Sequence, residues 1–145
     1  MNKIIGTVSG IIIFIFLSLT INFFSFSCSK ETTPPPEDSF NYPDSGLSFT
    51  AHIYPIFLRD CATTDCHQTG NPASGLDLET TRPTFIGQRH GLTVFPNDAD
   101  HSPLYLVLIA PYGGTPRMPL NRVQLPQEKI KAIRTWINEG ASINN

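Results

Sequence analysis

The sequence predicts a mainly α-helical domain in which a few short helices are joined by long loops. Three segments place apolar residues at the i, i+3 and i+4 spacing of an amphipathic helix, and each carries residues suited to a helix end. The stretches between them are rich in Gly, Pro, Asn and Thr, and none shows the sustained two-residue alternation of a strand. We expect the folded domain to span residues 47–145.

Residues 1–27 have the features of an export signal. Lys3 supplies a positive charge, and residues 4–26 contain no charged side chain. Cys28 follows and leads directly into the polar stretch 29–33, which resembles a bacterial lipoprotein signal whose cysteine becomes the lipidated first residue of the mature chain. This implies a membrane-anchored lipoprotein of the cell envelope, in the inner or the outer membrane. An ordinary signal peptide, or an uncleaved membrane anchor, is the alternative and also places the domain outside the cytoplasm.

Residues 28–46 form a predicted Pro-rich tether between this anchor and the domain. Three consecutive prolines, residues 34–36, favour extended polyproline geometry, and no apolar period appears in this stretch. Without residues 1–27 the chain loses only Lys3 among its charged residues, so its formal charge becomes −3. No basic patch remains, and we expect no nucleic-acid partner.

The first expected helix runs into Cys61. Ile53, Ile56 and Phe57 have helical spacing, and Thr50 is the expected N-cap.

Two further helices are expected nearer the C-terminus. Ser102 as N-cap and Pro103 at the first helical position begin an apolar segment that Pro111 stops. The last helix carries a stripe of Ile and Trp side chains and ends near Gly140, which is placed for a left-handed cap.

The segment "CATTDCH", residues 61–67, suggests covalent haem attachment. The familiar signature is C-x-x-C-H, but here four residues separate Cys61 from Cys66, and His67 follows at once. In a regular helix the two thiols would lie about 140° apart, so residues 62–65 must form a loop if both thiols face one group. Two alternatives remain open: a Cys61–Cys66 disulfide in an exported protein, and a zinc site that recruits a further ligand.

Met118 is a candidate second ligand for haem iron. It is the only methionine besides the initiator, and it lies between Arg117 and Pro119 in a loop rich in Gly and Pro. Methionine is usually a flexible core filler, but a thioether offered from such a loop suits the sixth position of a low-spin haem.

The ordered set of motifs resembles a small class I-type cytochrome c domain of exported bacterial proteins. The motifs are "IYPIF" (53–57), "CATTDCH" (61–67), "GLDL" (75–78), "SPLY" (102–105), "RMP" (117–119) and "WINEGA" (136–141). The resemblance implies a cytochrome c-like fold packed around one covalent haem c. It also implies that Cys61 and Cys66 bind the haem vinyl groups, and that His67 and Met118 are the axial ligands of the iron.

Other side chains could take part in such a site. Any one of His52, His90 and His101 could replace Met118 as the sixth ligand, although a solvated imidazole is the default in their polar contexts. Haem propionates could pair with arginines, because the forked guanidinium suits carboxylates. The candidates are Arg89, Arg117 and Arg122.

Two functions compete at this point. The first is a membrane-tethered monohaem cytochrome that carries single electrons to a redox partner protein. The second is a haem-free, disulfide-stapled interaction module on a lipid anchor. We expect no enzymatic activity, because no Ser/His/Asp set or carboxylate pair stands out and a haem with two strong axial ligands offers substrate no open position.

Overall fold

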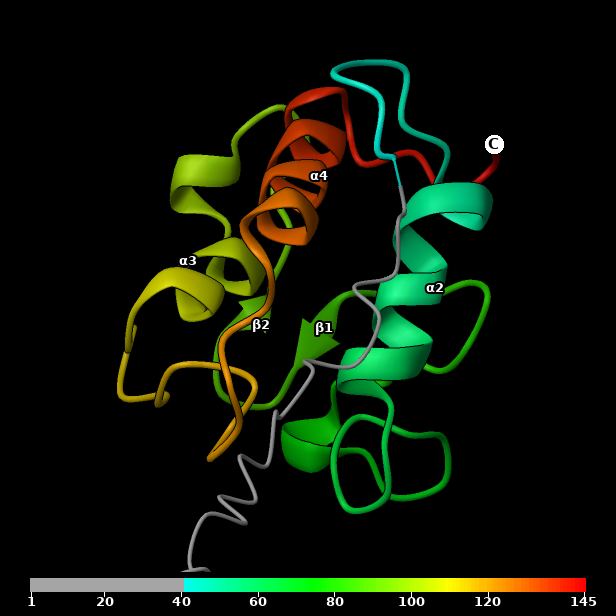
Figure 1. The fold of residues 1–145 in the computed structure, drawn as a ribbon. Coiled ribbons are helices and arrows are strands. Elements are labelled where there is room, and N and C mark those ends of the chain that lie inside the picture. The colour runs from blue at the N-terminus through cyan, green and yellow to red at the C-terminus, as the bar shows by residue number, and fades with distance from the viewer. Residues whose placement is uncertain (1–40) are drawn as a thin grey trace, which may run out of the picture. The chain divides into compact units, whose positions relative to one another are not determined.

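The computed structural model describes residues 41–145, which form a mainly helical domain (Figure 1). The predicted signal peptide, Cys28 and most of the predicted tether lie outside the described residues. Between residues 41 and 145 no helix combines the length and the hydrophobicity needed to cross a membrane.

The first described helix covers residues 49–61. It consists of a π-helical segment, Phe49–Ile53, the short α-helix α2, Tyr54–Ile56, and a second π-helical segment, Phe57–Cys61. It ends at Cys61, as predicted.

The predicted cap of this helix, Thr50, is wrong. Ser48 is the N-cap: its backbone is extended and its Oγ accepts a hydrogen bond from the Ala51 N–H at 3.1 Å. The helix begins earlier because Phe49 lies four residues before Ile53 and continues the buried stripe, where it is only 1% exposed.

Helix α3 covers Pro103–Ile109 and follows a 3₁₀ turn, Ala99–His101. Ser102 is its N-cap residue, as predicted, but the hydroxyl does not cap the helix. It donates to the Asp98 carbonyl at 2.7 Å and accepts from the Phe95 N–H at 2.8 Å, so it joins the preceding loop to the start of the helix. The helix ends at Ile109, and its C-cap residue Ala110 has the extended backbone that suits a residue before proline.

Helix α4, Gln127–Asn138, confirms the clearest sequence prediction. Its apolar stripe is buried, and Gly140 has a φ of +100° just beyond the helix end. Residues 41–46 contact this helix region: Asp44 pairs with Lys131 at 2.6 Å, and Glu139 accepts from the Gly46 N–H at 2.7 Å.

A two-stranded antiparallel hairpin was not predicted. Strand β1, Ile86–Gly87, pairs with β2, Gly91–Leu92, and a 3₁₀ turn at Ala73–Gly75 precedes it. Each strand has two residues, which is too short to show an alternation in the sequence.

Four aromatic rings form the centre of the core between helix 49–61 and α4. Phe49, Phe57, Phe85 and Trp136 lie with ring centroids 5.5–6.5 Å apart. Aromatic pairs at such distances add to the stability that burial itself provides. This cluster fixes the helix that carries Cys61 against α4.

We expect Ile133→Val to lower the free energy of unfolding by about 0.5–1.5 kcal/mol, because Ile133 is fully buried and loses one methylene. Ile109→Val is the matched control: this side chain is 43% exposed, and its change should stay within about 0.5 kcal/mol. Urea unfolding of both variants measures the difference. Equal losses would show that the core is not packed as described.

Candidate functional site

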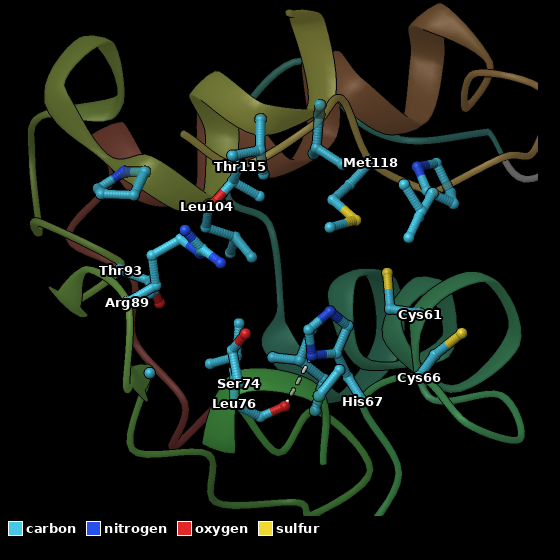
Figure 2. A pocket seen from close by; sticks show the side chains of 18 of the residues that line it. Cys61, Cys66, His67, Ser74, Leu76, Arg89, Thr93, Leu104, Thr115 and Met118 are labelled. Atoms are coloured by element: carbon cyan, nitrogen blue, oxygen red, sulfur yellow. Dashed lines mark hydrogen bonds between the residues drawn. The ribbon is translucent and has the colours of Figure 1, made fainter. Parts of the chain in front are cut away.

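A large cavity in the described domain brings together the four predicted attachment and ligand residues, Cys61, Cys66, His67 and Met118 (Figure 2). It holds about 1020 Å³ that no protein atom fills, including the part open to solvent. Its walls come from the loop after helix 49–61, the β1–β2 hairpin, α3 and the loop that follows α3. Most of the wall is apolar, with side chains such as Leu76, Leu104 and Val107.

The loop between the two cysteines has the form that the long spacing requires. The helix stops at Cys61, Asp65 adopts a positive φ of 62°, and the His67 N–H returns to the Cys61 carbonyl at 3.1 Å. Both cysteines therefore line the cavity although they are five positions apart. Backbone hydrogen bonds close this loop, and the buried Thr63 Oγ1 has no hydrogen-bond partner.

Both thiols are free, and both cysteines are partly buried. Burial, followed by the charge of Asp60, raises the pKa of the Cys61 thiol to about 12. A thiol with such a pKa stays protonated at neutral pH and reacts slowly in disulfide exchange. Asp60 is itself paired with Lys129, whose Nζ lies 3.0 Å from Oδ2.

The His67 ring is oriented by a backbone contact. Its Nδ1 lies 2.9 Å from the Leu76 carbonyl oxygen, a distance at which Nδ1–H donates to that oxygen (Figure 2). A carbonyl can only accept, so this contact fixes the proton on Nδ1 and leaves Nε2 with a free lone pair. The Leu78 N–H in turn donates to the His67 carbonyl at 2.9 Å. The segment 76–78 therefore binds both the ring and the backbone carbonyl of His67.

Met118 lines the cavity from the opposite wall. Figure 2 shows its thioether and the His67 imidazole facing one another, with the Cys61 sulfur beside the space between them. The Met118 N–H donates to the Val107 carbonyl of α3 at 2.7 Å. Its loop is closed by Arg117, whose guanidinium donates to the Met118 carbonyl at 3.2 Å and to the Arg122 carbonyl at 2.9 Å.

The three alternative histidines do not share one environment. His52 does not line the cavity, and its Nδ1 accepts from the Ser48 N–H at 2.9 Å. His101 is exposed and pairs with Asp98, whose hydrogen bond and charge raise the pKa of the imidazole. Only His90 lines the cavity, with Nε2 2.7 Å from Thr115 Oγ1.

The three arginines proposed as partners of the haem propionates also differ in whether they line the cavity. Arg89 and Arg122 line the cavity, and Figure 2 shows the Arg89 side chain reaching into it. Arg117 does not line it, because its guanidinium binds the backbone of its own loop. Among residues 41–145, no three His, Cys, Asp or Glu side chains are grouped so that they could hold a metal ion, and the zinc alternative therefore finds no support in this part of the chain.

Sequence reasoning missed the groups that orient the candidate ligands. The Leu76 and Val107 carbonyls are backbone atoms, which residue types do not reveal. The only signal was indirect, since Leu76 lies inside the quoted "GLDL" motif.

Residues 64–119 match the family model of Planctomycete cytochrome C (PSCyt1). The match supports a cytochrome c-like, haem-binding electron carrier. It includes Cys66, His67 and Met118, and it begins after Cys61. No curated protein and no solved structure matches the chain.

Proposed function

We propose that this protein is a monohaem c-type cytochrome that carries single electrons in the cell envelope. The observation that carries the proposal is the arrangement of the cavity wall: two free thiols and an oriented imidazole lie on one side, and a thioether lies opposite. Each of these groups is of a type that holds a c-type haem or its iron.

The chemistry of the cavity wall fits such a group. Its apolar wall would exclude water, and the residues that line it include all four proposed attachment and ligand residues. Arg89 and Arg122 also line it and supply guanidinium groups suited to the propionate carboxylates. A bound haem would supply one-electron exchange between ferric and ferrous iron.

Each of the four attachment and ligand residues has its own role in this proposal. Cys61 and Cys66 would add their thiols across the haem vinyl groups, and the resulting thioether bonds would make attachment permanent. His67 presents Nε2, since Leu76 holds the proton on Nδ1, and Met118 presents its sulfur from a loop fixed to α3. With both axial positions filled, no position is open for a substrate, which favours an electron carrier over an enzyme.

A redox titration of the matured protein tests this function. We expect a single reversible one-electron transition, with a potential in the raised range of His/Met ligation, and no binding of carbon monoxide to the reduced protein. A folded protein with a Cys61–Cys66 disulfide and no redox-active chromophore would support the disulfide-stapled interaction module instead.

We further propose that Cys28 carries a lipid and tethers the domain to a membrane, where it meets a redox partner protein. The basis is the signal-like sequence of residues 1–27 with its single charge at Lys3. Cys28→Ala should abolish lipidation and the processing that depends on it, so the precursor keeps its signal sequence and takes up no fatty acid.

Ser29→Ala is the matched control and should still fractionate with membranes. Metabolic labelling with a fatty acid measures lipidation, and fractionation measures association with the membrane. Unprocessed wild-type protein in the cytoplasm of the native host would refute this localisation.

A further inference from the structure

The Met118 loop begins with a tight turn that is held by His90. Tyr112 and Thr115 pair through backbone hydrogen bonds of 2.8 and 2.9 Å, and the two glycines between them, Gly113 and Gly114, have positive φ values of 55° and 79°. This is the conformation that glycine adopts without steric cost. Two backbone hydrogen bonds therefore close this turn immediately before the loop.

His90 contacts this turn at three points. Its Nε2 lies 2.7 Å from Thr115 Oγ1, and its ring lies 6.0 Å from the Tyr112 ring, tilted by 35°. A Cβ built on Gly113 would come within 2.7 Å of the His90 ring, so the imidazole lies flush against the glycine backbone. His90 comes from the connection between β1 and β2, a different part of the cavity wall.

The path from Thr115 to Met118 is short and stiff. Pro116 and Arg117 are the two residues between them, and proline restricts the backbone at the first. Arg117 is itself occupied in binding the Met118 and Arg122 carbonyls. A shift of Thr115 would therefore pass to Met118 with few torsions available to absorb it.

We propose that His90 is a positioning residue for Met118: through Thr115 it fixes the loop that presents the thioether to the cavity. The inference rests on the proposed function, because the role of His90 would be measured through the bond between Met118 and the haem iron. It assigns His90 a role as a fixed partner of the loop rather than as an axial ligand.

The experiment uses the full-length protein matured with haem. His90→Ala and Thr115→Val each remove one partner of the hydrogen bond, while His90→Gln and Thr115→Ser keep a group able to form it. His101→Ala is the matched control, since His101 is exposed and lies outside the cavity. The readouts are the weak sulfur-to-iron charge-transfer band of the oxidised protein and the affinity of the reduced protein for carbon monoxide.

His90→Ala and Thr115→Val should each weaken the band and raise the carbon monoxide affinity roughly fivefold, the factor that corresponds to one ordinary hydrogen bond. His90→Gln, Thr115→Ser and His101→Ala should behave as the wild type. Circular dichroism of each variant shows whether it is folded. If either His90→Ala or Thr115→Val fails to fold, the other still tests the inference.

One outcome overturns the inference and leaves the proposed function intact: an unchanged band and an unchanged carbon monoxide affinity in both disrupting variants. A wild-type protein without haem, or without the band, would instead contradict the proposed function itself.

Discussion

Replacing both Cys61 and Cys66 by Ser should abolish covalent haem attachment. In the wild type, we expect porphyrin absorbance to remain with the polypeptide after denaturation, and in the double variant it should separate completely. The reason is that Ser cannot form a thioether bond, although the cavity and His67 would remain. Denaturing electrophoresis with haem staining measures the difference.

The single variants and Cys28→Ser sharpen this result. Cys61→Ser and Cys66→Ser should each keep the haem through one remaining thioether bond, which would show that both thiols are used despite the four-residue gap. Cys28→Ser removes the third cysteine, which lies outside the domain, and should leave attachment per folded molecule unchanged. Full retention of the haem in the double variant would disprove attachment through this loop.

Replacing Met118 by Ala should change the redox chemistry more than the fold. The variant should lose the sulfur-to-iron charge-transfer band, its reduction potential should fall because the thioether favours the ferrous state, and its reduced form should bind carbon monoxide. Met118 is held by its backbone N–H on the Val107 carbonyl, which the substitution keeps. The expected loss is therefore that of the side chain beyond Cβ, including its sulfur, while the backbone of the loop stays bound to α3.

Val123→Ala provides the control for this variant. Val123 lies in the same connection before α4 but is 91% exposed, so band, potential and carbon monoxide binding should all stay at wild-type values. If Met118→Ala leaves band and potential unchanged, the distal ligand is elsewhere. His90 is then the first residue to replace, because it is the only one of the three alternative histidines that lines the cavity.

The sequence could predict those parts of the fold that depend on local patterns. Helix α4 follows from its apolar stripe and from Gly140, and the break after Cys61 follows from the angular distance between positions i and i+5. The start of the first helix was misplaced because the apolar stripe was counted from Ile53, although Phe49 already belongs to it.

The finer structure of the site could not be predicted in this way. The contacts of His67 with the Leu76 carbonyl and of Met118 with the Val107 carbonyl involve backbone atoms, which no residue type specifies. The bond between His90 and Thr115 spans 25 residues, and its geometry depends on a hairpin too short to leave a pattern. Arg117 looked like a partner for propionates because side-chain chemistry alone does not say that its own loop occupies it.

The most direct test of covalent haem binding is an absorption spectrum combined with the intact mass of the protein matured with haem-attachment machinery. We expect a c-type haem spectrum with a ferrous form that is low-spin, and a mass equal to one polypeptide plus one haem that survives denaturation. A fully folded protein whose mass shows two fewer hydrogens, from a Cys61–Cys66 disulfide, and whose spectrum shows no porphyrin would contradict it.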